Sequence, residues 1–186
     1  MAVELISKIE CDQSIVFVFK EQLNKRPVDS GKLNYQRIIV CRCLSQILGI
    51  EKVELEHMDN GAPYLPKYTD QYISISHSKQ WYAIQLSGVD RVGVDIQIIK
   101  ENIYAGRSYF INDEEERGIE LNNLNLNLIW SAKEALYKLK KGEVENYRNS
   151  ITILAIKENQ ITARVDTKII SCDYTILNGL VLVYVN

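Results

Sequence analysis

The apolar positions of the N-terminal part follow two different periods. Residues 15–19 (IVFVF) are β-branched and aromatic, which is typical of a buried strand. Residues 30–48 (SGKLNYQRIIVCRCLSQIL) open with a serine that can cap a helix and continue without a helix breaker. Residues 59–66 (DNGAPYLP) hold Asn-Gly and two prolines, which favour a turn or loop over a regular element. The pattern therefore predicts a strand, then a long helix, then an irregular segment.

Three short apolar segments come next. They are residues 72–76 (YISIS), 81–87 (WYAIQLS) and 91–98 (RVGVDIQI), connected by HSKQ and GVD. Apolar and polar residues alternate most clearly in the first and the third, as on strands with one buried face. Because the connections are short, we predict an antiparallel meander of three strands.

The second half of the chain changes from helical to strand periodicity. Residues 113–121 and 130–138 are typical of helices, and Asp113 is the expected N-cap of the first because glutamates follow it. Strands are predicted at residues 151–156, 160–165, 169–177 and 180–185. Asn178-Gly179 separates the last two, and this pair predicts a tight hairpin.

This order of elements predicts an α+β fold made of two similar halves related by a pseudo-twofold axis, residues 1–90 and 91–186. Each half is expected to hold a small antiparallel sheet packed on a long helix. The halves share no sequence repeat, so their similarity rests on the order of elements alone. A cleft between two such halves is a natural place for a ligand.

Composition narrows the class of protein. Of the 186 residues, 46% are hydrophobic and 25% charged, as in ordinary soluble domains. The net charge of −2 gives no overall attraction to nucleic acid, although a local basic pocket remains compatible with it. No leader-like start and no apolar run near ~20 residues is present, so we expect a cytoplasmic protein without a membrane segment. We also expect a monomer, because two halves already form an interface within one chain. The four cysteines lack metal-site spacing and are interpreted as reduced packing residues.

One acid stands on a predicted strand. In residues 91–98 the strand period of two places Val94 on one face and Gly93, Asp95 and Gln97 on the other. Aspartate is depleted in strands, and a glycine on the same face can admit a close ligand. Two interpretations remain open at this point: an edge-strand aspartate that faces water, or an acid that belongs to a ligand site.

A second stripe of polar residues lies on a predicted helix. Trp130, Glu134 and Lys138 follow one another at intervals of four and so share one helix face, while Gly142 is expected to end the helix. The plain interpretation is a surface ion pair between Glu134 and Lys138, worth ~0.2–0.5 kcal/mol. The alternative is that these two side chains carry chemistry.

The order of four motifs favours the alternative. The loop at 59–66, then Ser76-His77-Ser78, then GVD at 93–95 and WSAKEALYK at 130–138 resemble the 4′-phosphopantetheinyl transferases of the surfactin-synthetase-activating type. The resemblance implies two α+β halves with coenzyme A in the cleft between them and Mg²⁺ on its pyrophosphate. It implies transfer of the phosphopantetheine arm to a serine of an apo carrier protein, with release of adenosine 3′,5′-bisphosphate. The carrier would serve fatty-acid, polyketide or peptide synthesis.

The resemblance also implies a catalytic set. Asp95 and Glu134 become Mg²⁺ ligands, and Gln97 is expected to act through a water. Lys138 becomes the cation on the phosphates. Glu134, or a metal-bound water oriented by Glu114, would accept the proton of the carrier serine.

Contacts with the coenzyme follow in the same way. The resemblance assigns Ser76 and His77 to the phosphates and the loop Gly61-Ala62-Pro63 to the adenine. Lys133, like Trp130, belongs to the motif and is assigned to the shape of the coenzyme pocket.

Two positions depart from the family pattern. Gln97 stands where many relatives have glutamate, and Ala62 stands where a basic residue is common. The second departure leaves the 3′-phosphate to other cations, and Lys25, Arg26 and Arg42 are the candidates. The first keeps one alternative to a transferase open, a non-catalytic module that binds coenzyme A or a nucleotide. A third hypothesis is an unrelated Mg²⁺ phosphohydrolase.

Overall fold

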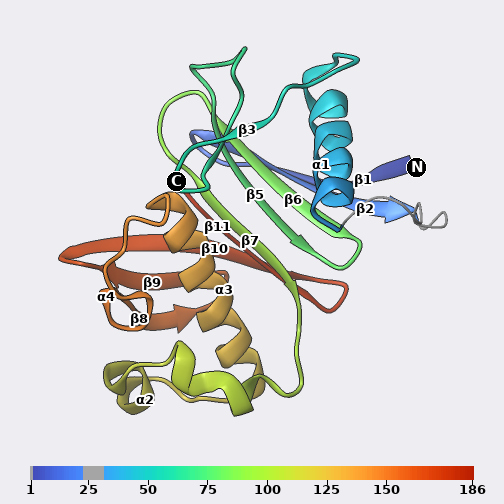
Figure 1. Cartoon of the computed structure of the whole chain (residues 1–186). Coiled ribbons are helices and arrows are strands. Elements are labelled where there is room, and N and C mark those ends of the chain that lie inside the picture. The colour runs from blue at the N-terminus through green and yellow to red at the C-terminus, as the bar shows by residue number, and fades with distance from the viewer. Residues whose placement is uncertain (1, 23–31) are drawn as a thin grey trace.

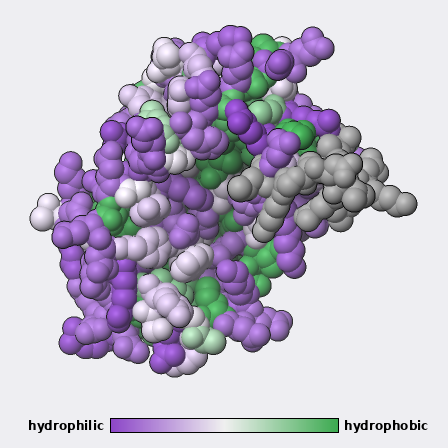
Figure 2. Space-filling model, in the orientation of Figure 1, coloured by the Kyte–Doolittle hydropathy of each residue, from purple (hydrophilic) through white to green (hydrophobic). Residues whose placement is uncertain are grey.

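The computed structural model describes residues 2–22 and 32–186, which form a mixed α+β structure with antiparallel sheets (Figure 1). The capping serine predicted at position 30 lies outside these residues. Figure 2 shows a largely hydrophilic face on which hydrophobic residues gather in a recess near the centre. Within the described part of the chain, no helix is long and apolar enough to cross a membrane.

The first sheet has four strands in the order β1-β2-β6-β5. Its strands are β1 (Ala2–Glu10), β2 (Ser14–Gln22), β5 (Tyr72–Ser78) and β6 (Trp81–Ser87), and every neighbouring pair is antiparallel. Helix α1 (Lys32–Leu48) lies against this sheet. The short strands β3 (Glu56–His57) and β4 (Pro63–Tyr64) form a separate two-stranded ladder. The segment predicted as an irregular loop therefore contains one short strand.

The second sheet has five strands in the order β7-β11-β10-β9-β8. They are β7 (Gly93–Ile98), β8 (Ile151–Lys157), β9 (Gln160–Val165), β10 (Lys168–Leu177) and β11 (Leu180–Val185). Helix α3 (Asn123–Leu139) crosses this sheet, and three short helices lie beside it: η1 (Ile103–Tyr109), α2 (Asp113–Gly118) and α4 (Tyr147–Ser150). The predicted Asn178-Gly179 hairpin is confirmed, with both residues at positive φ.

The layers follow from the alternation of side chains along the strands. On β2, Phe17 and Phe19 point to α1, whereas Val16 and Val18 pack in a second cluster with Val94 of β7. The same alternation on β11 sends one set of residues to this second cluster and the other set to α3. The molecule is thus built as helix, sheet, sheet and helix, with one apolar layer between the two sheets.

The predicted meander of three strands is wrong in its third member. β5 and β6 pair as expected, but β7 leaves them and pairs with β11, where Asp95 lies opposite Val183. Serine side chains connect β7 to β5 instead. The Val94 N–H donates to Ser74 Oγ at 3.0 Å and the Ile98 N–H to Ser78 Oγ at 3.1 Å. The alternating serines of YISISHS therefore join the two sheets.

The cap of α2 also differs from the prediction. Asn112, not Asp113, is the N-cap, and its side chain accepts hydrogen bonds from the N–H groups of Glu114 and Glu115. The Asn112 N–H in turn donates to the side chain of Glu115, and this second hydrogen bond completes a capping box. This register turns Glu115 inward and leaves Glu114 at the surface.

Candidate functional site

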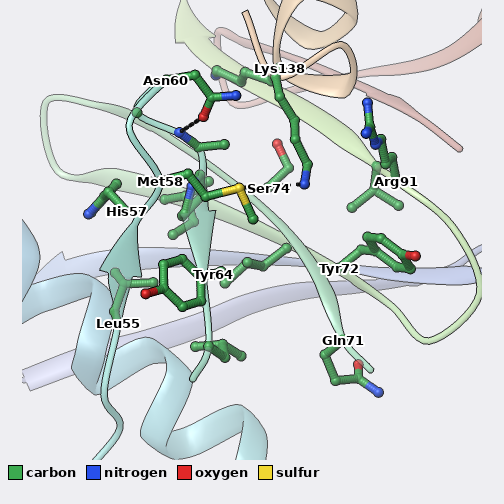
Figure 3. A pocket seen from close by; sticks show the side chains of 18 of the residues that line it. Leu55, His57, Met58, Asn60, Tyr64, Gln71, Tyr72, Ser74, Arg91 and Lys138 are labelled. Atoms are coloured by element: carbon green, nitrogen blue, oxygen red, sulfur yellow. Dashed lines mark hydrogen bonds between the residues drawn. The ribbon is translucent and has the colours of Figure 1, made fainter. Parts of the chain in front are cut away.

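A cavity of about 680 Å³ opens beside the contact between the two sheets. The β3–β4 loop, α1 and β5 supply one wall, and the start of β7 with the C-terminal end of α3 supplies the other. Figure 3 shows Asn60 and Met58 of the β3–β4 loop opposite Lys138 and Arg91. The predicted loop residues, Gly61 with its two successors, are among the residues that line the cavity. We call this cavity the central pocket.

The charges that line the central pocket are all positive. Arg37, Arg91, Lys138 and Lys141 line it, and no aspartate or glutamate is found among its described lining residues. Two of them have acidic partners outside the lining, Asp95 for Lys138 at 2.8 Å and Glu143 for Arg91 at 3.7 Å, but the described lining itself presents only positive charges. Tyrosines from the β3–β4 region and β5 add flat apolar surface. The pocket thus has the chemistry of a site for an anionic ligand that carries an aromatic ring.

Asp95 is buried behind this pocket. Its residue is 5% exposed, and three side chains donate to its carboxylate, each at 2.8 Å: Ser76 and Lys138 to Oδ1, and Ser131 to Oδ2. The interpretation of a water-facing aspartate is therefore wrong. Buried carboxylates are retained where they are paired and hydrogen-bonded, as this one is.

A glycine is needed at position 93 for a different reason from the one predicted. A Cβ atom at this position would lie 2.0 Å from the carbonyl oxygen of Ala135 in α3. The glycine therefore admits the helix, not a ligand, to the face of β7. This close approach brings Glu134 and Lys138 of α3 to the same side of the strand as Asp95.

Lys138 connects the buried acid to the pocket. Its Nζ donates to Asp95 Oδ1 at 2.8 Å and to the carbonyl of Val94 at 2.9 Å, and its side chain also lines the central pocket. The ion pair of Lys138 is thus made across to β7 and not along the helix to Glu134. With 25% of its side chain exposed, the ammonium remains within reach of a ligand.

Glu134 is held by a residue that the sequence did not indicate. The hydroxyl of Tyr147 in α4 donates to Glu134 Oε1 at 2.8 Å. Burial raises the pKa of Glu134 above its ordinary value, and the charge of Asp95 acts in the same direction. The Tyr147 hydrogen bond and the charges of Lys138 and Lys100 act against this shift. No motif spacing marks Tyr147, because the contact depends on how the chain returns after α3.

Gln97 lies on the same face of β7 and is also buried. Its Nε2 donates to the backbone carbonyl of Asn127 in α3 at 2.9 Å. The amide nitrogen is therefore used to attach the strand to the helix. The side-chain oxygen is the part of Gln97 that a water or a cation would contact.

The two residues predicted to contact phosphates diverge. Ser76 points to β7 and donates to Asp95. His77 is exposed, and alternation along β5 turns it to the opposite face, where its ring stacks on Tyr82 with 5.9 Å between centroids. The first four residues of this strand, 72–75, line the central pocket, whereas neither Ser76 nor His77 is among its described lining residues.

Two other predicted residues lie apart from the Asp95 cluster. Glu114 is exposed and pairs with Arg164 of β9, and this hydrogen bond lowers the pKa of the carboxyl. Lys133 is fully buried, and its Nζ lies 3.0 Å from Glu115 and donates to the carbonyls of Phe110 and Arg148. The capping-box spacing Asn-x-x-Glu is the sequence signal that could have distinguished Glu115 from its neighbour.

The acidic residues match the requirements of one kind of metal ion. Among the described residues, no group of three His, Cys, Asp or Glu side chains is placed to enclose a cation. Asp95 and Glu134 offer two carboxylates that interact electrostatically, and Lys138, which pairs with Asp95, connects them to the lining of the central pocket. Mg²⁺ is commonly held by one or two carboxylates and takes its other ligands from waters and substrate phosphates. The donor set therefore suits Mg²⁺ that arrives with a phosphate ligand.

Of the three cations predicted to contact a 3′-phosphate, one lies among the residues that the structure describes. Lys25 and Arg26 lie outside the described residues. Arg42 lies on α1, but of the described residues on this helix Arg37 is the arginine that lines the central pocket.

No protein-family model matches the chain, and no curated protein matches it. The functional argument therefore depends on the geometry of the site and on the sequence motifs.

Proposed function

We propose that this protein is a 4′-phosphopantetheinyl transferase that moves the phosphopantetheine arm of coenzyme A to a serine of an apo carrier protein in a Mg²⁺-dependent reaction. One observation carries the proposal. The central pocket is lined by four cations and no described carboxylate, and one of those cations, Lys138, is bonded directly to the buried Asp95. An anion site thus adjoins an acid site at the position where GVD and WSAKEALYK meet.

Coenzyme A suits this pocket in charge and in shape. The ligand carries a pyrophosphate, a 3′-phosphate and an adenine, and cations with flat side chains recognise such groups. The volume of about 680 Å³ is in the usual range for cofactor sites. The β3–β4 loop with Gly61, Ala62 and Pro63 would lie against the adenine, and Arg91 and Lys141 would face phosphates from the second wall.

The reaction breaks the phosphoanhydride bond of the coenzyme's pyrophosphate and forms a phosphoester bond to the carrier serine, whose proton must be accepted. The serine oxygen of the carrier attacks the phosphorus next to the pantetheine, and the bond to the leaving adenosine 3′,5′-bisphosphate breaks. Mg²⁺, held by Asp95 and Glu134, would neutralise charge on the pyrophosphate. Lys138 would stabilise the negative charge that develops on the leaving group. Glu134 would also be the group that accepts the serine proton.

The connectivity of the sheets supports the expected pseudo-twofold relation. In the first sheet β2 precedes α1, and β6, which closes the β5–β6 hairpin, returns beside β2. In the second sheet β7 precedes α3, and β11, which closes the β10–β11 hairpin, returns beside β7. Two copies of one strand–helix–hairpin unit would place a ligand between them, where the central pocket lies.

Intact-protein mass spectrometry tests the reaction directly. An apo acyl carrier protein is incubated with this protein, coenzyme A and Mg²⁺, with a matched EDTA sample as control. We expect a mass gain of one phosphopantetheine that EDTA abolishes. No gain on several unrelated carriers would contradict the proposal.

Gln97 favours a second candidate function. A neutral amide in place of a carboxylate weakens the metal site, as in a module that binds coenzyme A without turnover. Calorimetric binding of coenzyme A together with an unchanged carrier mass would identify that module. Release of free phosphopantetheine without a carrier would instead identify a phosphohydrolase.

A further inference from the structure

Tyr147 occupies an unusual position for a partly buried tyrosine. Its hydroxyl donates to the carboxylate of Glu134 at 2.8 Å. Its ring packs edge-on against Tyr137, with 5.7 Å between centroids, and at a tilt against Trp130, with 6.0 Å. Both rings belong to α3, the helix that carries Glu134. One side chain of α4 thus contacts Trp130, Glu134 and Tyr137 of α3.

The backbone around Tyr147 is fixed by a buried ion pair. Lys133 Nζ lies 3.0 Å from Glu115 and donates to the carbonyl of Arg148 at 2.9 Å. Asn112 Nδ2 donates to the same carbonyl at 3.2 Å. Charged groups without exposure hold their geometry because any departure leaves a charge unpaired. The residue after Tyr147 is therefore held by two helices, α2 and α3.

We infer that Tyr147 is a positioning residue that holds the Glu134 carboxylate in the orientation needed to bind a divalent cation beside the central pocket. The inference rests on the proposed function. Tyr147 donates to Glu134 Oε1, while among the described residues Oε2 has no protein donor, so one oxygen is held and the other is available to a cation. Hydrogen bonds to ligating carboxylates commonly change metal affinity by about 10–100-fold when they are removed.

The same inference gives Lys133 a role. The motif lysine does not contact the pocket; through the Arg148 carbonyl it holds the turn of α4 on which Tyr147 stands. A chain of contacts thus runs from Glu115 through Lys133 and Tyr147 to Glu134. Its non-covalent links are Glu115 to Lys133, Lys133 to the Arg148 carbonyl and Tyr147 to Glu134, each within 3.0 Å, and the peptide chain joins Arg148 to Tyr147.

The test measures Mn²⁺ binding and does not depend on turnover. Wild-type protein and Tyr147→Phe, both saturated with coenzyme A, are titrated with Mn²⁺ while free Mn²⁺ is counted by electron paramagnetic resonance. We expect the dissociation constant for Mn²⁺ to rise about 10–100-fold in Tyr147→Phe. Coenzyme A affinity without metal should remain unchanged, because the hydroxyl acts on the carboxylate. Circular dichroism checks that the ring packing preserves the fold.

Tyr109→Phe is the matched control, since it removes a hydroxyl from an exposed tyrosine that is not among the described residues lining the central pocket. We expect its Mn²⁺ affinity to stay within about twofold of wild type. Equal Mn²⁺ affinity in Tyr147→Phe and wild type would overturn the inference and leave the proposed function standing. A wild-type protein that binds coenzyme A but no Mn²⁺ would overturn both.

Discussion

At the scale of single residues, the site is made of groups that already have protein partners. Asp95 accepts three hydrogen bonds, Glu134 accepts one, and Gln97 donates one. Each side chain therefore contributes to the fold as well as to the proposed chemistry. Substitutions at these positions will change stability by amounts that the contacts predict.

Asp95→Ala is expected to destabilise the protein by about 1–3 kcal/mol, because it leaves the donors Ser76, Ser131 and Lys138 without their acceptor. Urea denaturation measures this loss. Asp70→Ala, in an exposed turn, is the control and should lie within about 0.5 kcal/mol of wild type. Equal stability of the two variants would show that the Asp95 contacts do not hold in solution.

Glu134→Gln is expected to stabilise the protein at neutral pH. The folded-state pKa of Glu134 is raised above its unfolded value, so its contribution to stability is present at low pH and is lost as pH rises through the folded pKa. Glutamine removes the ionisation and keeps an oxygen for Tyr147.

Thermal melts across pH check this sign. The melting temperature of Glu134→Gln should exceed that of wild type near neutral pH, and the gap should close toward about pH 4. Glu158→Gln, in an exposed turn, provides the comparison. A wild-type protein more stable than Glu134→Gln at neutral pH would refute the argument.

Gln97→Glu tests whether the family glutamate can simply be restored. An ionised glutamate has no donor for the Asn127 carbonyl, which now lies 2.9 Å from Gln97 Nε2, so two oxygens would face each other. We expect the free energy of unfolding, measured by urea denaturation, to fall by about 1–3 kcal/mol in Gln97→Glu. It should not fall in the exposed control Gln160→Glu. Unchanged stability with tighter Mn²⁺ binding would mean that position 97 turns to the metal.

At the scale of elements, the glycine of β7 decides how close α3 lies. Gly93→Ala would place a methyl group 2.0 Å from the Ala135 carbonyl, and backbone on both sides prevents an easy shift. We expect a loss of about 3 kcal/mol or more and weaker coenzyme A binding, since Lys138 moves with the helix. Gly118→Ala, with nothing within 4 Å, is the control and should be near neutral in the same denaturation assay. A neutral Gly93→Ala would contradict this packing.

Elements were predictable where their pattern is local. The alternation of GVDIQI gave the two faces of β7 correctly, because strand period needs no tertiary information. The partner of β7 was not predictable in this way, since Asp95 lies opposite Val183, far away in the sequence. Asn112 and Glu115 determine where α2 begins. This capping-box spacing is a local signal, but the four consecutive acidic residues at 113–116 made it hard to recognise.

The candidate site was predictable to a smaller extent. Motif order placed Asp95, Glu134 and Lys138 together, and the structure brings Lys138 and Asp95 into contact. The bonds that fix them come from Ser131 and Tyr147, whose roles depend on how α3 and α4 pack. Side chains that pair between two elements are brought together by the fold, so no spacing in the sequence predicts the pair.

At the scale of the whole molecule, the two halves share a core. Val16, Val18 and Trp81 of the first sheet pack with Val94 and other residues of the second in one buried cluster. Separating the two sheets would expose this apolar layer to water, and the free-energy cost would be about 25 cal/mol for each Å² of apolar surface. We therefore expect the connection near residue 90 to cross between two sheets of one core, and not to separate independently stable units.

A fragment of residues 1–90 is accordingly expected not to fold alone. Without β7 and β11 the outer face of β2 and β6 loses its apolar cover, and Ser74 and Ser78 lose the N–H groups they accept from. Nuclear magnetic resonance should show collapsed amide dispersion, with increased binding of a hydrophobic dye. Addition of a 91–186 fragment is the control and should restore dispersion, because it supplies the missing layer. A fragment that folds alone would instead mean that α1 and its sheet are sufficient, and that the central pocket lies between two bodies free to move apart.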